Sequence, residues 1–372
     1  MIIGIDASRA FFKKRTGIEE YSFQIIKHLR NKLKDAEVVL YLRPESLDPK
    51  KCGFNVPKKW KVKILNWPRL WTQIGLALEL FLNPVDTLFI PAHIVPCCHV
   101  KKAVVVVHGL EYEFLPEAYS RWDRLYMRWS IRKSCRKAKR VIAVSENTKN
   151  DLVRMYKISK RKIDVIYEGY ARETISPNKI KRNISSRFKI LNFKFLLFIG
   201  RIEFRKNTLG IIRSFEILKE KYKIPHKLVL AGGLGYGYED VVKKADASEY
   251  KNDIVLTGYV KDSDKWKLLK NADVFLFPTF YEGFGLPILE AQSLGIPVVV
   301  ANNSSIPEVV GQYMRSLLVD PNDYKKIADF TYKIIFDKKL KNNIKKAGYK
   351  NIKRFSWDLC AEKIAKILLK KS

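Results

Sequence analysis

Short apolar segments rich in Val, Ile, Leu and Phe recur along this chain, with helical patterns between them. Such segments are typical of parallel strands buried on both faces, and their alternation with helices is the rhythm of βαβ units. The first series reads MIIGID, EVVLYL, KVKIL, DTLFIP, AVVVVH, RVIAVS and DVIYEG, and the second reads FLLFIG, KLVLAG, DIVLTG, ADVFLFP, IPVVVA and SLLVD. We therefore predict two α/β domains, each built on a parallel sheet.

The 372 residues exceed what one hydrophobic core usually holds. We predict a Rossmann-like N-terminal domain over 1–172, a linker over 173–190 and a Rossmann-like C-terminal domain over 191–355. Residues 356–372 carry apolar side chains at helical spacing, which predicts a terminal helix that could pack back on the N-terminal domain. Ligands of open parallel sheets gather at the carboxyl ends of the strands, so the two sheets are expected to face each other across a cleft.

Positive charge dominates the chain, with 71 Lys and Arg against 38 Asp and Glu and a net charge of +33. A field of this sign attracts nucleic acid, anionic lipid or phosphorylated substrates. The sequence contains no zinc-finger spacing, RNP aromatic pattern or basic zipper, so nucleic acid is not the expected partner.

The cysteines and the apolar stretches indicate the cellular compartment of the protein and whether it crosses a membrane. The five cysteines are odd in number and the only close pair, Cys97 and Cys98, is adjacent, which fits neither a disulfide framework nor a metal knuckle. The first strand begins at the N-terminus without a signal-peptide pattern, and the apolar stretch from Ile74 to Leu82 is short and carries Glu79. We expect a cytoplasmic protein that does not cross a membrane.

The strongest functional signal is the segment EGFGLPILE, from Glu282 to Glu290. Pro287 suits the first turn of a helix and Gly295 its end, so Gly283-Phe284-Gly285 is expected to form a tight turn that opens the helix. Backbone N–H groups at such a start favour a phosphate. The two glutamates would repel a diphosphate and suit sugar hydroxyls instead, although two ordinary surface charges would fit the same pattern.

A second signal is the segment GRIEFRKN, which directly follows the strand FLLFIG. Arg201 and Lys206 could reach one anion, the arginine through its fork and the lysine as a point charge. They would neutralise a diphosphate leaving group, unless they are only solvated charges in a very basic chain. The glycine-rich AGGLGYGYED lacks the dinucleotide-binding spacing, so no nicotinamide site is expected.

Both segments resemble those of family-4 retaining glycosyltransferases of the GT-B fold, which carry E-x7-E and Gly-Arg-x4-Lys-Asn. VLTGYV at 255–260 and VVVANNSSIPEVVG at 298–311 match the family's pattern as well, and the likeness covers nearly the whole chain. The resemblance implies that Arg201 and Lys206 hold the donor diphosphate, while Glu282 faces the transferred sugar and Glu290 holds the ribose. The remaining donor contacts that it implies are backbone at Gly283, Phe284, Gly285 and Leu286 for sugar and phosphate, and Tyr259 and Val260 for the nucleobase.

The acceptor side is expected in the first domain. Thr16 and Gly17 precede a helical pattern, so Gly17 should present its N–H at a helix start, and the resemblance makes this loop cover the donor phosphate and shape the acceptor pocket. An ordinary strand-to-helix loop is the alternative. His108 ends the strand AVVVV, and position and resemblance together predict that it contacts the transferred sugar. Many relatives have Asp after this His, whereas this chain has Gly109; Ser145 is an acceptor-side candidate that could instead cap the next helix.

The segment Arg121 to Arg140 holds nine basic residues and one acid, while Trp122, Leu125, Tyr126 and Trp129 fall on one helical face. This pattern is typical of a helix lying on an anionic membrane, and a packing helix with a solvated basic side is the alternative. Peripheral contact at the cytoplasmic membrane face would suit a lipid-linked acceptor.

The predicted function is transfer of a hexose, mannose-type favoured, from a UDP- or GDP-sugar to a hydroxyl of a glycan or lipid-linked acceptor in polysaccharide biosynthesis. His108, Glu282, Arg201 and Lys206 are the predicted catalytic residues, and the resemblance implies retention of the anomeric configuration. No cofactor or metal is expected, because the basic side chains and the helix start supply positive charge. The alternatives are a GT-B-like epimerase or phosphorylase, and a protein that binds nucleic acid or an anionic surface.

Overall fold

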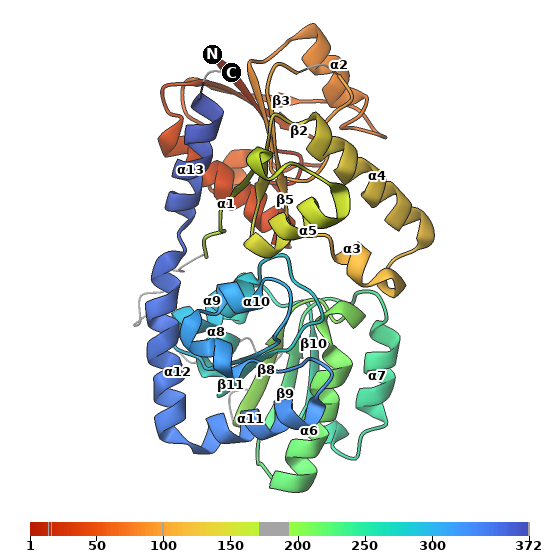
Figure 1. Cartoon of the computed structure of the whole chain (residues 1–372), viewed down its shortest axis with the longest axis vertical. Helices are drawn as coiled ribbons and strands as arrows, with labels where there is room; N and C mark the ends of the chain where they lie inside the picture. Colours follow the sequence, from red (N-terminus) through yellow and green to blue (C-terminus); the bar gives the residue numbers. More distant parts are fainter. Residues whose placement is uncertain (14, 16, 99, 171–192, 371–372) are drawn as a thin grey trace. The chain divides into compact units, whose positions relative to one another are not determined.

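A computed structural model describes residues 1–13, 15, 17–98, 100–170 and 193–370. They form two compact units (Figure 1). The first comprises Met1–Glu113, Arg121–Gly169 and Phe355–Ser372, and the second Phe114–Ser120 and Tyr170–Arg354. The linker predicted over 173–190 lies outside the described residues.

The first unit is built on a parallel seven-stranded sheet of order β3-β2-β1-β4-β5-β6-β7. Its centre is buried on both faces, which explains the uninterrupted apolar run of β5. The strands are β1 (Ile2–Asp6), β2 (Glu37–Leu42), β3 (Trp60–Ile64), β4 (Thr87–Ile90), β5 (Ala103–Val107), β6 (Arg140–Ala143) and β7 (Ile163–Val165). The helices are α1 (Gly17–Lys32), α2 (Gly75–Leu82), α3 (Glu111–Phe114), α4 (Arg121–Lys137), α5 (Glu146–Tyr156) and α13 (Trp357–Leu369).

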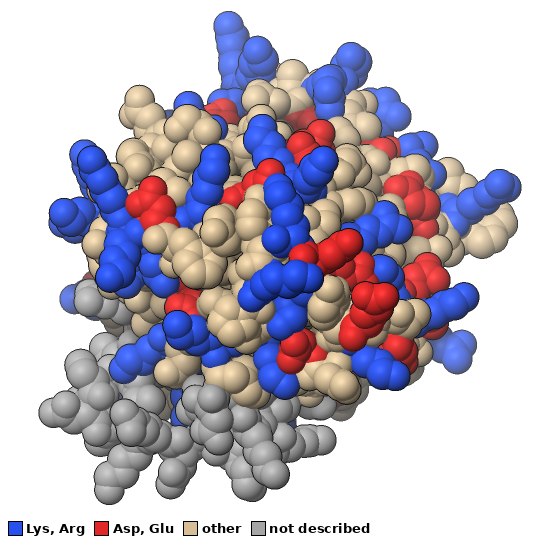
Figure 2. Space-filling view, turned by 90° about the horizontal axis from the view of Figure 1, so that it is seen from below, with Lys and Arg blue, Asp and Glu red and all other residues tan. Residues whose placement is uncertain are grey.

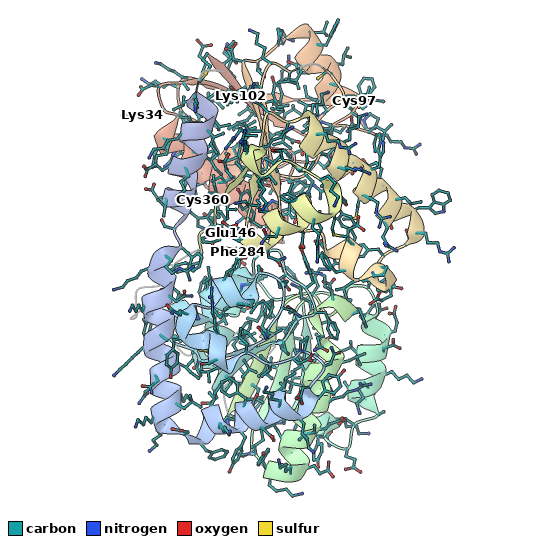
Figure 3. All side chains as sticks on the ribbon, viewed as in Figure 1. Lys34, Cys97, Lys102, Glu146, Phe284 and Cys360 are labelled. Carbon is teal, nitrogen blue, oxygen red and sulfur yellow. The ribbon has the colours of Figure 1, made fainter. Side chains whose placement is uncertain are left out.

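The terminal helix α13 packs on α1 in the first unit, and the Lys32 ammonium lies 3.0 Å from the Asp358 carboxylate. At its other end, Lys102, labelled in Figure 3, donates to the carbonyl oxygen of Lys370 at 2.7 Å. A cation suits this end because the last carbonyls of a helix carry partial negative charge. Helix α13 thus belongs to the first unit although it follows the second in the chain.

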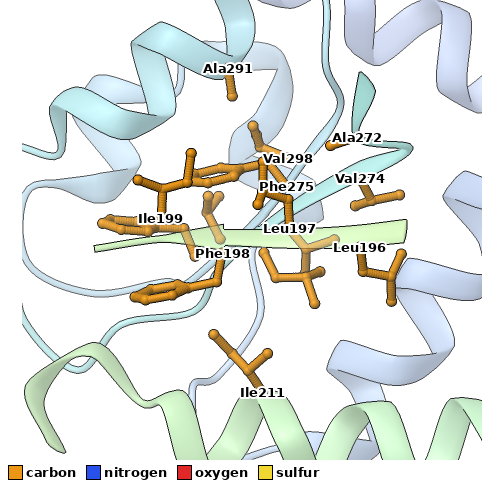
Figure 4. Close-up of a cluster of buried hydrophobic side chains, with 14 of the residues drawn as sticks. Leu196, Leu197, Phe198, Ile199, Ile211, Ala272, Val274, Phe275, Ala291 and Val298 are labelled. Carbon is orange, nitrogen blue, oxygen red and sulfur yellow. The ribbon is translucent and has the colours of Figure 1, made fainter. Parts of the chain in front are cut away.

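The second unit has a parallel five-stranded sheet of order β10-β9-β8-β11-β12. Its core is the buried cluster around β8 and β11 drawn in Figure 4. The strands are β8 (Phe195–Ile199), β9 (Lys227–Ala231), β10 (Ile254–Gly258), β11 (Val274–Phe277) and β12 (Val298–Val300). The helices are α6 (Thr208–Tyr222), α7 (Tyr238–Asp246), α8 (Asp262–Asn271), α9 (Leu286–Ser293), α10 (Ile306–Val309), α11 (Tyr324–Phe336) and α12 (Lys338–Asn351).

Every strand predicted from the sequence is present except the last. The segment SLLVD forms only an isolated bridge between Val319 and Ala301, because a 3-10 turn over Gln312–Leu317 takes up the residues before it. Leu318 and Val319 are nevertheless buried, so the apolar residues of this segment indicated burial correctly but did not indicate a strand. Among the helices of the described chain, none is both long and apolar enough to span a bilayer.

Candidate active site

Three loops of the second unit converge at the carboxyl ends of neighbouring strands. The 3-10 turn Phe204–Lys206 follows β8, residues 278–285 follow β11, and residues 301–305 follow β12. A backbone hydrogen bond joins the first two loops, in which the Phe280 N–H donates to the Arg205 carbonyl at 3.0 Å. Asn207 adds a side-chain bond to the Pro278 carbonyl at 2.9 Å. The motifs read separately along the sequence therefore meet at one edge of one sheet, where open α/β sheets bind ligands.

A compact cluster of two cations and two carboxylates lies at this edge. Lys206 Nζ donates to Glu282 Oε1 at 2.6 Å, and the two side chains are only 11% and 9% exposed. The Arg205 guanidinium donates to Glu203 at 2.9 Å and lies 3.4 Å from the other oxygen of Glu282. Arg205 thus joins the two acids. Sequence reasoning missed Glu203 and Arg205 as partners, although both stand inside the motif GRIEFRKN.

Burial lowers the pKa of Lys206 from its ordinary value, and the neighbouring Arg205 charge lowers it further, while Glu282 acts in the opposite direction. The ammonium also lies 5.2 Å from the centroid of the Phe277 ring. An anion that comes close to a buried lysine stabilises the charged form of its ammonium group. The cluster can therefore accept the negative charge of a phosphate next to Lys206.

The turn between Glu282 and α9 has the conformation that the glycines predict. Gly285 caps α9 with a φ of 109°, Pro287 occupies the first turn, and Gly295 follows the helix with a φ of 68°. Ser305, which sequence reasoning missed, donates to the carbonyl oxygens of Glu282 at 3.0 Å and of Phe284 at 2.9 Å. Figure 3 labels Phe284 in this turn. The loop after β12 thereby holds two carbonyls of the turn that leads into α9.

The other predicted donor residues occupy different surroundings. Arg201 is 59% exposed, and its Nε lies 3.6 Å from Glu203, so its fork can still move toward a ligand. Glu290 is buried and accepts from Lys265 at 2.7 Å, so the two glutamates of EGFGLPILE have different cationic partners. After β10, Tyr259 is exposed and Val260 joins the hydrophobic core.

His108 lies in the first unit at the end of β5, as predicted. Its Nε2 donates to the Pro91 carbonyl at 2.7 Å, and its Nδ1 lies 3.3 Å from the buried Glu168 carboxylate. The Tyr21 ring packs edge-on against the imidazole at 4.5 Å between centroids. These contacts fix the ring orientation. Glu168 was missed because the sequence offers only its place after the seventh strand.

The remaining acceptor-side residues are near helix starts. Helix α1 begins at Gly17, as predicted, while Thr16 lies outside the described residues. Ser145 is fully buried and caps α5, where its Oγ accepts from the Thr148 N–H at 3.0 Å. The capping alternative for Ser145 therefore describes what this hydroxyl does in the structure.

Two units, each with a parallel sheet covered by helices, are the arrangement of the GT-B fold. Family models agree, since "Glycosyltransferase Family 4" matches residues 15–173 and "Glycosyl transferases group 1" matches residues 180–351. The chain belongs to this family of glycosyltransferases.

Individual relatives point the same way. The chain is 29% identical over 261 residues to O-antigen chain mannosyltransferase B of Escherichia coli, covering 70% of this chain and 68% of that one. It is 30% identical over 254 residues to the capsular polysaccharide biosynthesis glycosyltransferase CapM of Staphylococcus aureus, covering 64% and 63%. The crystal structure of Anabaena HepE in complex with UDP-glucose shares the fold, with a TM-score of 0.74 at 19% identity over 99% of this chain and 98% of that one.

Proposed function

We propose that this glycosyltransferase moves a hexose of the mannose type from a UDP- or GDP-sugar to a hydroxyl of a glycan or lipid-linked acceptor, with retention of the anomeric configuration. The observation that carries the proposal is the buried contact between Lys206 and Glu282 beside the start of α9. It sets a phosphate-binding cation next to a carboxylate suited to sugar hydroxyls. The names of the two sequence relatives support a polysaccharide product, and one of them supports mannose.

The positions of the charged side chains in the site lead to a mechanism for the reaction. The bond from the anomeric carbon to the diphosphate breaks while the acceptor oxygen bonds to the same face of that carbon. The acceptor proton then passes to the departing diphosphate. Lys206, Arg201 and the start of α9 would stabilise the charge that develops on the leaving group, and Glu282 would orient the sugar through its hydroxyls. His108, held by Glu168 and Pro91, would contact the transferred sugar from the first unit.

In this proposal Lys206 and Arg201 neutralise the diphosphate, and no metal ion is needed for that. Transfer should therefore continue at an unchanged rate after dialysis against EDTA. Loss of activity on chelation, with recovery on adding Mg²⁺ or Mn²⁺, would contradict metal independence and leave the transferase assignment intact.

The donor is testable by thermal shift against UDP-glucose, UDP-galactose, GDP-mannose and the free nucleotides. A ligand that binds only the folded protein raises the melting temperature. We expect the cognate nucleotide sugar to raise it in the parent protein and to have a much smaller effect in Lys206→Ala. No shift with any nucleotide sugar would count against a donor site here, and donor turnover without an acceptor would favour an epimerase.

A further inference from the structure

His93 lies in the loop after β4, at the carboxyl edge of the sheet of the first unit. Its backbone N–H donates to the Val106 carbonyl of the neighbouring strand β5 at 3.1 Å. Its ring packs edge-on against the His108 imidazole, with 5.3 Å between the ring centroids. His93 stands outside the motifs read from the sequence, and the structure brings it directly beside a predicted active-site residue.

The order of the strands makes this edge a place where ligands collect. Strands β2 and β3 lie on one side of β1, while β4 and the later strands lie on the other side. The direction in which the chain crosses the sheet therefore reverses between β1 and β4. Open α/β sheets bind ligands at the carboxyl ends of the strands at such a reversal. His93 follows β4 and Arg9 follows β1, so both lie where a ligand of this unit is expected.

The backbone at His93 has an uncommon conformation. Its φ is 51°, in the left-handed region that few residues other than glycine adopt. The Ile94 N–H donates to the Ala92 carbonyl at 2.7 Å and closes a three-residue turn on His93; with a positive φ at its centre, such a turn is the strained form. Lys157 and Lys223 also have a positive φ, but each caps a helix, where it is ordinary. A strained residue at a ligand-binding edge, away from any helix end, points to a functional role.

The imidazole of His93 is neutral and has a nitrogen without a partner. Burial, followed by the nearby charges of His108 and Arg9, lowers the pKa of His93 to about 3, so the ring is uncharged at neutral pH. Its Nδ1 is buried and has no hydrogen-bond partner among the residues that the structure describes. Because a bare nitrogen tolerates this better than an N–H, the proton belongs on Nε2. The Nε2–H group is then the donor that this ring can offer to a ligand.

A neutral donor suits an uncharged ligand. Figure 2 shows basic side chains over one face of the molecule, with acidic ones among them. In a chain of net charge +33, a cation alone therefore marks no particular site. A neutral imidazole lacks the charge that binds a phosphate strongly, but it forms an ordinary hydrogen bond with a sugar hydroxyl. The ligand of His93 is thus expected to be the sugar part of a substrate.

We propose that His93 binds the acceptor sugar, donating from Nε2 to one of its hydroxyl oxygens; this inference rests on the proposed transferase function. His108, the neighbouring imidazole, is assigned to the transferred sugar, and the acceptor must lie next to that sugar. The bonded hydroxyl is not the attacking one, because a hydrogen bond donated to the attacking oxygen would weaken its attack. Loss of His93 should therefore raise the KM for the acceptor and change kcat little.

Binding of three octyl glycosides, with mannose, glucose or galactose as the sugar, tests the proposal by saturation-transfer NMR on the whole protein. At least one of them should bind the parent protein. His93→Ala should weaken that binding about tenfold, as expected for the loss of one hydrogen bond to a ligand. His93→Gln should stay within about threefold of the parent, because its amide nitrogen can replace the Nε2 donor.

His28 provides the matched control, since it is another half-buried histidine of the first unit. It lies near the end of α1, toward the amino ends of the strands. His28→Ala should change glycoside binding less than about twofold, as expected for a residue that does not touch the ligand. The melting temperature shift caused by a nucleotide sugar should be the same in His93→Ala as in the parent protein, because the proposed donor contacts lie in the second unit.

A comparison of two variants without the ring tests the strain. Glycine adopts a positive φ freely, so His93→Gly should melt about 2–4 °C above His93→Ala, although both should bind the glycosides weakly. A glycine variant that melts below the alanine variant would count against strain at His93 and against the proposal.

Parent-like glycoside binding by His93→Ala, an equal loss in His28→Ala, or no binding of any of the three glycosides by the parent would overturn the proposal. Glycoside binding needs no donor, so it can fail separately from the proposed function. His93-dependent binding without any response to nucleotide sugars would support the sugar contact and contradict the transfer. Intact transfer with an unchanged acceptor KM in His93→Ala would do the opposite.

Discussion

Lys206 Nζ and Glu282 Oε1 lie 2.6 Å apart, although 76 residues separate them in the chain. The contact joins the loop after β8 to the loop after β11, and in the proposed donor site it would let a carboxylate stand beside a phosphate without repelling it. If a diphosphate binds there, Lys206 can form an ion pair with it while Arg205 still contacts the second oxygen of Glu282. Arg205 is in this sense a positioning residue.

Lys206→Ala and Glu282→Ala should each lower turnover about 10²-fold or more, because each removes a preorganised charge from the site. Steady-state kinetics with the cognate donor measures this. Lys221→Ala, which removes an exposed cation of the same unit, is the matched control and should be near normal. Near-normal turnover in both site variants would contradict the assignment.

The lowered pKa of Lys206 predicts an alkaline limb in the pH profile of kcat/KM. Binding of the diphosphate needs the ammonium, so kcat/KM should fall as the pH rises through this pKa, which lies below that of an ordinary lysine. Arg205→Gln removes one cause of the lowering and should move the limb to higher pH, with turnover reduced about tenfold because Glu282 loses a partner. Arg213→Gln changes an exposed residue on α6 and is the control, so the alkaline fall of kcat/KM should stay at the same pH. If that fall does not move in Arg205→Gln either, the Arg205 charge does not lower the pKa of Lys206.

Glu290 is predicted to accept from the ribose hydroxyls of the donor. The parent enzyme should then discriminate against a 2′-deoxyribose donor by about tenfold or more, and Glu290→Gln should lose most of that preference. Comparing kcat/KM for the two donors in both proteins measures the effect. An unchanged preference in the variant would place the ribose elsewhere.

The Lys102 ammonium should stabilise the docking of α13 on the first unit. Lys102→Met removes its bonds to the last carbonyls of the helix and should cost about 1–3 kcal/mol in the free energy of unfolding. Urea denaturation followed by tryptophan emission measures it. Lys101→Met breaks only an exposed pair with Asp86 and should cost less than about 0.5 kcal/mol, so equal losses would argue against a specific role for Lys102.

The sequence predicted the parallel sheets and the helix start at Gly285 well, because buried strands and glycine turns are encoded locally. It singled out Lys206 and Glu282 separately and did not predict that they pair, since side-chain partners depend on how distant loops meet. Ser305 illustrates the same limit: a serine in NNSS gives no sign that its hydroxyl will meet two carbonyls more than twenty residues earlier.

Burial was harder to predict than secondary structure. The stripe on α4 has the same spacing whether it is packed or exposed, and only tertiary structure shows that Ser130 and Ile131 face inward while Trp122 does not. For α2 the sequence shows Glu79 among apolar residues, and only the contact with Lys63 reveals which way that acid points.

The central claim, retaining hexosyl transfer from a nucleoside diphosphate sugar, is tested most directly by the anomeric configuration of the product. The donor that gives the largest thermal shift is incubated with polysaccharide or lipid-linked acceptors, and proton NMR reads the new glycosidic linkage while released nucleoside diphosphate is counted. We predict one nucleoside diphosphate per transferred sugar and the same anomeric configuration in donor and product. An inverted linkage, or a donor that is consumed without transfer to any acceptor, would contradict the account.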